Sequence, residues 1–302
     1  MNYQHLIDTA TAIGCGVTLQ ASMAAATTFK VGGPADLLID LPDAAAVSAV
    51  LAICHAEEIP YLFIGNGSNL VVGDKGFRGA VLRLERAAQP TLLEDGRIYA
   101  PAGMSLQRLC LFARDHSLTG LEFAYGIPGA VGGAVYMNAG AYDGEMAQIV
   151  VSADCVTADG TPITLTAAEL GMTYRHTALM ERDLIVVGAT LQLQVGDYDT
   201  IWEKMKDLMA RRHDKQPLEY PSAGSFFKRP EGYFAGKLIQ DAGLKGFTVG
   251  GAQVSEKHAG FVINRGGATA ADLVELRRQV HDKVYAEFGV HLEPEVRFVG
   301  EF

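Results

Sequence analysis

The sequence of 302 residues predicts an α+β protein in which short strands and helices are interspersed. Short apolar runs bounded by glycine, proline and aspartate alternate with stretches whose apolar residues recur at helical spacing. One segment, Gly65-Asn66-Gly67, begins like a dinucleotide-binding fingerprint, but Leu70 occupies its third glycine position and turn-forming residues follow. The βαβ context of that fingerprint is therefore missing, which disfavours a Rossmann fold.

Helix and strand patterns follow one another through the first two thirds of the chain. Pro42-Asp43 begins an alanine-rich helix that runs to about Glu58, and a buried strand follows over 61–64. A second helix begins near Ser105 and ends by Gly120. Further strands are predicted over 80–84, 149–157, 163–165 and 184–195. Asp159-Gly160, between two of these strands, is typical of a hairpin turn.

The last third contains a candidate boundary at Gly196-Asp197 and two predicted helices. One helix begins at Thr200 and leads into a proline-containing loop over 216–230. The other runs from Thr269 to about residue 288, because Thr269 and Asp272 have the spacing of a capping box. Gly289 ends that helix, and a final strand is expected over 290–299.

Composition restricts the class of partner. The chain is 49% hydrophobic and 20% charged with a net charge of −10, which disfavours nucleic acid and anionic membranes. Its four cysteines are scattered with no C-x-x-C pair, so neither a metal site nor a redox dithiol is expected. The N-terminus has no signal-peptide pattern, and no apolar run approaches the roughly 20 residues that span a bilayer. These features predict a cytoplasmic protein without a metal.

Two glycine-rich segments are the most informative part of the sequence. One covers 65–69, directly after a predicted strand, and the other covers 126–134. The second has no polar side chain, so its glycines serve close approach or dihedral angles that other residues resist. Because turns rich in backbone N–H groups cradle anions, the pair indicates a large phosphate-containing cofactor. The alternative is two tight turns without a ligand.

Three polar residues are candidates for chemistry, and each has an ordinary structural alternative. Arg175 either binds a carboxylate or forms a surface salt bridge. Ser225, between a glycine and two phenylalanines, either donates a proton in a dry site or satisfies a turn. Glu295 shares one face of the predicted last strand with a second glutamate and an arginine. It is therefore either catalytic or part of an exposed strand face.

Basic residues gather after the candidate boundary, which suggests that this part of an acidic protein handles an anionic substrate. They are Arg211, Arg212, Lys215, Lys228, Arg229, Lys237 and Lys245. The alternative is that these side chains simply cover solvent-facing helices.

Eight short motifs, taken in chain order, resemble one family. They cover 27–35, 65–69, 126–134 with 138–142, 174–175, 221–230, 235–239, 256–261 and 292–298. Each motif is weak alone, but together they span nearly the whole chain and resemble the UDP-N-acetylenolpyruvoylglucosamine reductases. The compact second half is similar to the second subtype, which lacks an inserted substrate-covering loop.

This resemblance implies a fold that the periodicity alone does not give. Two α+β subdomains of the FAD-binding vanillyl-alcohol-oxidase (PCMH) type would cover 1–85 and 86–198. A smaller α+β substrate-binding domain would cover 199–302, with the final strand over 290–302 returning towards the flavin. The implied reaction is NADPH-dependent reduction of UDP-N-acetylglucosamine enolpyruvate to UDP-N-acetylmuramate through non-covalent FAD, in peptidoglycan precursor synthesis. The implied oligomeric state is a monomer or weak oligomer.

The resemblance also implies residue roles. Ser225 matches the proton donor, and Arg175 and Glu295 match the pair that stabilises an enolate-like intermediate. To donate a hydrogen bond, Glu295 would need a raised pKa. The implied FAD contacts are Val31, Gly65, Asn66, Gly67, Ser68, Asn69, Ile127, Pro128, Gly129, Gly132, Gly133 and Asn138. The implied substrate contacts are Tyr142, Lys215, Lys228, Lys237 and His258.

Two other classes remain open on the sequence. One is a flavoprotein of the same fold that oxidises a different substrate, although no histidine or cysteine in the glycine-rich segments invites covalent flavin. The other is a nucleotide-binding protein without catalysis, in which the three candidate residues would all be structural. The sequence departs from the family pattern at Thr177, where many relatives carry serine, and at Tyr125, where a smaller or aliphatic residue is frequent.

Overall fold

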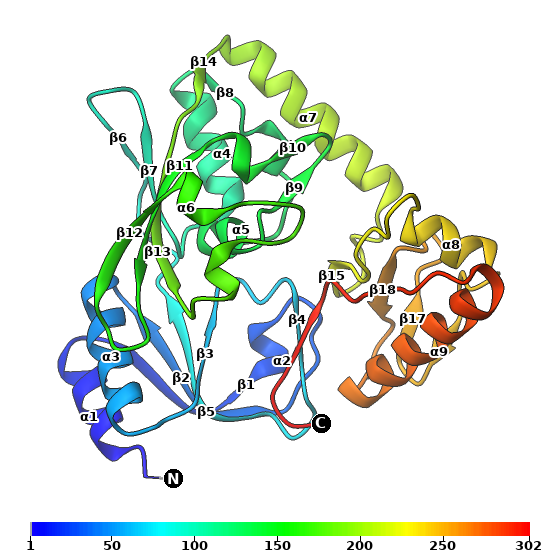
Figure 1. The fold of residues 1–302 in the computed structure, drawn as a ribbon, viewed down its shortest axis with the longest axis horizontal. Helices are drawn as coiled ribbons and strands as arrows, with labels where there is room; N and C mark the ends of the chain where they lie inside the picture. Colours follow the sequence, from blue (N-terminus) through cyan, green and yellow to red (C-terminus); the bar gives the residue numbers. More distant parts are fainter. Residues whose placement is uncertain (1) are drawn as a thin grey trace. The chain divides into compact units, whose positions relative to one another are not determined.

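The computed structural model describes residues 2–302, which form two compact units that interleave along the sequence. The first unit contains the residues up to Leu19, Leu37–Asn66 and Gly79–Ala210. The second unit contains Gln20–Asp36, Gly67–Arg78 and Arg211–Phe302. Each unit has its own buried apolar core. The α+β class is confirmed, since helices and strands alternate through the chain (Figure 1).

A four-stranded sheet forms near the N-terminus. Its order is β1 (Gly16–Ser22), β2 (Pro34–Leu41), β5 (Phe77–Leu84) and β3 (Tyr61–Ile64), with β3 and β5 parallel. The predicted alanine-rich helix is α3 (Ala44–Ala56), and it contacts α1 (Gln4–Ala12). It begins after Asp43, whose carboxylate accepts the N–H of Ala46 at 2.8 Å. Its predicted apolar stripe of Val47, Val50, Leu51 and Cys54 is buried.

A five-stranded antiparallel sheet forms the other part of the first unit. Its order is β12 (Pro162–Thr166), β11 (Val150–Val156), β13 (Ile185–Leu191), β7 (Ile98–Pro101) and β6 (Thr91–Leu92). The hairpin predicted at Asp159-Gly160 is confirmed, because β11 and β12 are antiparallel neighbours. The short helix α5 (Val131–Tyr136), within the second glycine-rich segment, packs against β13 and β7.

Two boundaries in the first unit differ from the prediction. The helix that begins after Ser105, α4 (Leu106–Asp115), ends at Asp115 and not near Gly120. The chain turns at Ser117, with φ 54°, so that β8 (Leu118–Thr119) can pair with β14 (Gln194–Val195). The strand predicted over 184–195 is therefore two strands, β13 and β14. Both boundaries were mispredicted because the pairing of β8 with β14, two segments far apart in the sequence, decides where the helix and the strand end.

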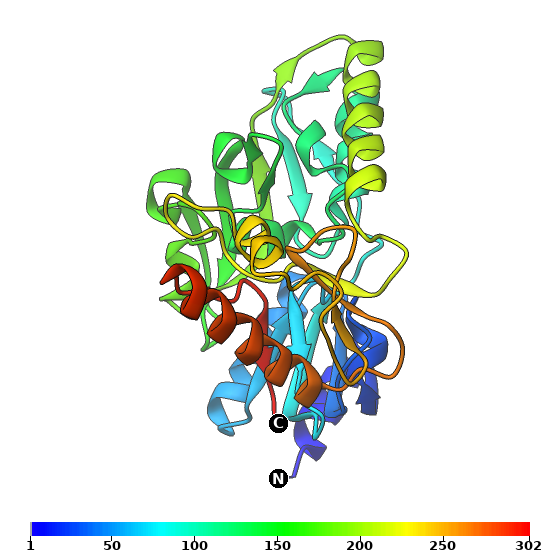
Figure 2. The ribbon, with the colours of Figure 1, turned by 90° about the vertical axis from the view of Figure 1, so that its right-hand side faces the viewer.

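The second unit contains a four-stranded antiparallel sheet and two packed helices. The sheet order is β15 (Ser222–Ser225), β18 (Phe261–Asn264), β17 (Ala252–Val254) and β16 (Thr248–Val249). Helix α9 (Ala270–Phe288) contacts β16, β17 and α8 (Ala235–Asp241) (Figures 1 and 2). The predicted capping box of Thr269 and Asp272 is confirmed. Asp74 also accepts the N–H groups of Ala270 and Ala271 at 2.8 and 2.9 Å.

The C-terminal strand is much shorter than predicted. Only β19 (Arg297–Val299) forms, and it pairs in parallel with β4 (Leu70–Val72), directly after the first glycine-rich segment. Upstream of it the backbone bonds elsewhere: Lys228 N–H donates to Glu293 O, and Glu295 N–H donates to Phe226 O. The predicted strand over 290–299 is wrong in extent because residues 293–295 pair with the segment after β15.

The remaining elements include one long helix, α7, and several short ones. They are α2 (Met23–Ala26), β9 (Gly140–Ala141), β10 (Gly144–Glu145), α6 (Ala167–Leu170), α7 (Tyr198–Lys215) and 3-10 turns at Glu122–Ala124, Met146–Gln148 and Ala178–Met180. No helix within residues 2–302 combines the length and the hydropathy needed to cross a membrane.

Candidate functional site

The two glycine-rich segments touch within the first unit. The side-chain amide of Asn66 donates to Pro128 O at 2.6 Å. A Cβ atom at Gly65 would lie 3.0 Å from the Cβ of Ala130, so a larger residue would push the two turns apart. These contacts join residues that the sequence assigned to one cofactor.

The first glycine-rich turn presents unused backbone donors. The N–H groups of residues 66–69 donate to no other residue in the described part of the chain. Gly67, with φ 62°, lies so close to the carbonyl of Ala26 that a Cβ would sit 2.4 Å from that oxygen. Consecutive unpaired N–H groups on a tight turn suit an anionic ligand, so this segment fits the pyrophosphate of a dinucleotide cofactor.

The second segment divides its glycines between packing and open space. A Cβ at Gly132 would lie 2.8 Å from the Cβ of Ala102, so this glycine lets α5 approach the end of β7. A Cβ at Gly133 would meet nothing within 4 Å. Gly129 O accepts from Leu106 N, and Ile127 N donates to Ala124 O. Val31, in the second unit, is 2% exposed and belongs to the core of that unit.

Arg175 lies on a tight turn of the first unit. The N–H groups of Thr173 and His176 donate to each other's carbonyls, and Arg175 between them has φ 54°. Its guanidinium donates to Asn138 O at 3.3 Å and to Gly140 O at 3.2 Å. A non-glycine residue in the left-handed region is uncommon, and such strain tends to occur where a side chain must be presented.

Tyr142 is presented in a similar way. It forms with Asp143 the two-residue turn between β9 and β10, and both residues have positive φ, 52° and 67°. This is the backbone of a type I′ turn, which glycine and asparagine usually occupy. Tyr142 is 38% exposed at the tip of the hairpin. Within the first unit, Arg175 is bonded to Gly140 at the base of the same hairpin.

Ser225 and Glu295 are brought together in the second unit. Ser225 ends β15, where Gly224 has φ 75° and the register with β18 shifts, a bulge that re-aims the following side chain. Glu295 N–H donates to the carbonyl of Phe226, the next residue after Ser225, at 2.9 Å. The side chain of Asn69 donates to Glu295 O at 3.1 Å. Glu295 is thus hydrogen-bonded to the first glycine-rich turn through Asn69 and to Phe226, the residue after Ser225.

His258 lies in the loop between β17 and β18 of the second unit. Gly260 N donates to its Nδ1 at 3.0 Å, and Gly260 O accepts from Phe226 N. Burial lowers the pKa of His258; a backbone hydrogen bond opposes this and nearby Lys245 reinforces it. A neutral imidazole whose Nδ1 accepts a hydrogen bond carries its proton on Nε2. His258 therefore offers one N–H donor beside the strand that carries Ser225.

The three predicted substrate lysines have different surroundings. Lys228 is paired with Glu293, and Lys237 on α8 is paired with Asp241 one helical turn later. Lys215 is exposed at the end of α7. Two of the three cations thus already have a carboxylate partner, which an anionic substrate would have to displace.

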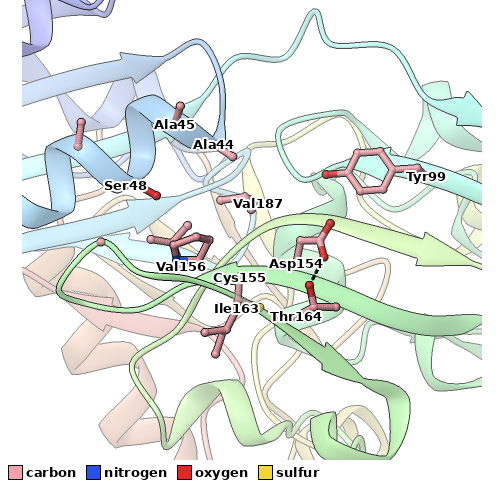
Figure 3. A pocket seen from close by; sticks show the side chains of 13 residues that line it. Ala44, Ala45, Ser48, Tyr99, Asp154, Cys155, Val156, Ile163, Thr164 and Val187 are labelled. Atoms are coloured by element: carbon pink, nitrogen blue, oxygen red, sulfur yellow. Dashed lines mark hydrogen bonds between the residues drawn. The ribbon is translucent and has the colours of Figure 1, made fainter.

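A cavity of the first unit is lined by none of these residues. This cavity of about 880 Å³ opens between α3 and the sheet strands β11 and β12 (Figure 3). Its polar groups include Asp154 and Thr164, which hydrogen-bond to each other at 2.7 Å. No residue that the sequence assigned to the cofactor or the substrate lines it. The cavity therefore carries none of the predicted chemistry.

Comparison with known proteins identifies the family. Residues 216–299 match the C-terminal domain of UDP-N-acetylenolpyruvoylglucosamine reductase, and residues 35–166 match an FAD binding domain. The UDP-N-acetylenolpyruvoylglucosamine reductase of Agathobacter rectalis is 51% identical over 288 residues, which cover 91% of each chain. That of Clostridium botulinum (strain Hall) is 50% identical over 285 residues, covering 94% of this chain and 93% of the relative.

The chain belongs to the UDP-N-acetylenolpyruvoylglucosamine reductase family.

Solved structures agree with this assignment. The crystal structure of UDP-N-acetylenolpyruvylglucosamine reductase (MurB) from Thermus caldophilus has a TM-score of 0.79 and 36% identity, covering 94% of this chain and 98% of that one. An alkyldihydroxyacetonephosphate synthase structure, 14% identical with a TM-score of 0.51, covers 65% of this chain and 41% of its own, and shares the fold alone. The predicted FAD-binding fold of the vanillyl-alcohol-oxidase type is confirmed.

The structure also shows connections that sequence reasoning missed. Gly260 links His258 to the backbone beside Ser225, and Asn69 bonds to the main chain of Glu295. Both residues lie in motifs of the reductase family, but spacing alone gave no sign of their partners. The catalytic and ligand-contact roles of the individual residues stay predictions.

Proposed function

We propose that the chain catalyses the NADPH-dependent reduction of UDP-N-acetylglucosamine enolpyruvate to UDP-N-acetylmuramate. Its family membership supports the substrate class, and its match to an FAD binding domain supports the cofactor. The catalytic assignment is supported chiefly by the hydrogen bond from Glu295 N–H to Phe226 O. This bond joins the backbone of Glu295, the candidate acid, to the residue directly after Ser225, the candidate proton donor.

Bound FAD would accept a hydride from NADPH and supply one to the enolpyruvyl methylene carbon. The N–H groups of residues 66–69 would hold its pyrophosphate, and the turn around Pro128 would support that segment through Asn66. The open space beside Gly133 leaves the start of α5 accessible to such a group.

The remaining steps belong to the side chains. Hydride addition to the methylene carbon builds negative charge that delocalises onto the substrate carboxylate, and a guanidinium such as that of Arg175 stabilises this charge. The hydroxyl of Ser225 then donates its proton to the adjacent carbon, since a carbanion is basic enough to be quenched by a weak acid. Glu295 stabilises the enolate-like intermediate.

Substrate recognition would use further predicted side chains of each unit. His258 Nε2–H is a donor for the diphosphate or the sugar, and Tyr142 presents a ring at the hairpin tip. Lys215, Lys228 and Lys237 would offset the diphosphate charge. The protein would act in the cytoplasm as a monomer or weak oligomer.

The test is the visible spectrum of the anaerobic holoenzyme during its two half-reactions. NADPH should bleach the flavin absorbance, and the enolpyruvyl nucleotide sugar should restore it. Ser225→Ala should keep the bleaching and slow the restoration by about 10²-fold or more, because only the proton donor is lost. Glu295→Gln should behave in the same way, and Ser222→Ala, two residues before the bulge glycine of the same strand, is the matched control. Equal loss of both half-reactions in Ser225→Ala would reject the proton-donor role, and flavin that never reoxidises with this substrate would reject the function.

A further inference from the structure

The side chain of Asn138 is completely enclosed, and both its nitrogen and its oxygen form a hydrogen bond. The residue is 0% exposed and has φ 42°, in the left-handed region that asparagine tolerates better than most residues. Its Nδ2 donates to Thr173 O at 3.0 Å, and its Oδ1 accepts from Ala147 N at 2.9 Å. Both ends of the amide therefore bind main chain of the first unit, which leaves them engaged before any cofactor arrives.

The two partners of Asn138 lie at the bases of two separate turns. Thr173 begins the tight turn that presents Arg175, and Ala147 follows the hairpin that presents Tyr142. At the tips, Arg175 and Tyr142 both have positive φ. Such backbone persists only where the surroundings over-determine it. Asn138 supplies part of that constraint to both turns at once.

Arg175 is also held at its far end by the same residue. Its guanidinium donates to the backbone carbonyl of Asn138 and to Gly140 O. A second bond fixes the other side of the Arg175 turn, because the hydroxyl of Thr177 donates to Tyr136 O at 2.9 Å. The segment over 136–140 thus donates to the Arg175 turn through Asn138 Nδ2, and its carbonyls accept from Thr177 and from the guanidinium itself.

The chemistry of the position is specific to asparagine. One short side chain must offer a donor on one side and an acceptor on the other, on a left-handed backbone. Aspartate keeps the acceptor for Ala147 but sets an anionic oxygen against the carbonyl of Thr173. Glycine accepts the left-handed conformation and supplies neither bond.

We propose that Asn138 is a positioning residue that fixes Arg175 and Tyr142 relative to each other, so that a carboxylate-bearing substrate meets a preformed cation and ring. This role differs from the flavin contact implied by the family resemblance. The inference rests on the proposed function of Arg175 as the group that binds the substrate carboxylate.

The experiment compares the two half-reactions in Asn138→Gly and Asn138→Asp holoenzyme. Displacement of a positioned group by about 1 Å can slow a reaction by about 10²-fold. Reoxidation of the flavin by the enolpyruvyl substrate should therefore slow by roughly 10- to 100-fold. The rate of flavin reduction by NADPH and the affinity for FAD should each change by less than about twofold, far below the tenfold change that corresponds to about 1.4 kcal/mol. Asn138→Gly is the variant that keeps the backbone relaxed if Asn138→Asp does not fold. Thr173→Ala is the matched control, because its side chain takes part in none of these bonds.

A double-mutant cycle with Arg175→Ala separates positioning from general destabilisation. If Asn138 acts through Arg175, then Asn138→Gly should slow reoxidation little further in the Arg175→Ala background. Full additivity, or parallel loss of FAD affinity and NADPH reduction, would overturn the proposal. If Arg175→Ala by itself leaves reoxidation unchanged, the proposed function of Arg175 fails. If Arg175→Ala slows it but Asn138→Gly does not, only the positioning role fails.

Discussion

The imidazole of His258 shows how one residue is tuned by its surroundings. Half-buried against Phe261 and bonded through Nδ1 to Gly260, it has a pKa below the ordinary value, chiefly because of burial. The family resemblance implied that His258 contacts the substrate, but it did not give the protonation state of the ring. The structure makes it a neutral donor at physiological pH, which is the form that an uncharged hydrogen bond to a diphosphate or sugar requires.

The lowered pKa of His258 predicts a pH dependence of stability. Below the ordinary histidine pKa of about 6.5, the unfolded chain takes up a proton that the folded chain resists, so stability falls as pH falls through the folded pKa. His258→Gln removes that titration. We therefore expect the melting temperature of the native protein to fall more steeply than that of His258→Gln between pH 7 and pH 5, within the titration range of histidine.

The control for this measurement is His55→Gln, which replaces an exposed histidine near the end of α3. Its pH profile should follow that of the native protein. Parallel profiles for the native protein and His258→Gln would show that burial of this ring does not affect folding.

At the scale of elements, α5 illustrates two uses of adjacent glycines. Gly132 faces the Cβ of Ala102, whereas Gly133 faces open space. Both lie in one six-residue helix, so helix propensity acts on them alike. The sequence could not distinguish them, because the difference lies in what a distant strand places opposite each position.

This contrast predicts opposite effects of two neighbouring substitutions. Gly132→Ala should destabilise the protein by about 1–3 kcal/mol, because a Cβ would overpack against Ala102. Gly133→Ala should leave stability unchanged or raise it by about 0.5–1 kcal/mol, since alanine is the better helix former. Urea unfolding of the apoprotein measures both. A destabilised Gly133→Ala apoprotein would contradict the assignment, while weaker FAD binding by a stable Gly133→Ala would support its place beside the cofactor.

For the whole molecule, the main finding is that the units interleave. The second unit takes 20–36 and 67–78 from the N-terminal part of the chain. Phe29, Val31 and Val71 from these segments belong to its core, and Phe29 packs edge-on against Phe226 at 6.4 Å between ring centroids. The division into an FAD-binding domain up to residue 198 and a substrate-binding domain from residue 199 stays a prediction.

The interleaving predicts that residues 199–302 do not fold alone. That fragment would lack Phe29, which is 0% exposed in the full chain, as well as β4, the partner of β19. Loss of a buried phenylalanine alone costs about 3–5 kcal/mol, a large share of the stability of a small domain. Thermal unfolding of the fragment by circular dichroism should show no cooperative transition, in contrast to the full chain. A sharp transition in the fragment would refute this.

Local chemistry explains which parts of the fold the sequence predicted. The capping box at Thr269, the Asp159-Gly160 hairpin and the strand at 61–64 depend on neighbours within a few residues, and all three are confirmed. The end of α4 and the extent of the last strand depend on pairing with distant segments, and both predictions were wrong. In the candidate site, the motifs named the residues, but the bonds of Asn69, Asn138 and Gly260 became visible only in three dimensions.

The sequence by itself determined the α+β class, the family and the residues that carry its motifs, because local periodicity and short motifs are written in neighbouring positions. Only the tertiary structure decided that Glu295 is hydrogen-bonded to the residue after Ser225, and that Asn138 joins the strained turns of Arg175 and Tyr142. It also decided that the second unit includes two segments from the N-terminal part of the chain. The physical reason is that each of these features is a hydrogen bond or a packing contact between segments far apart in sequence. Such contacts leave no periodic trace in the segments themselves.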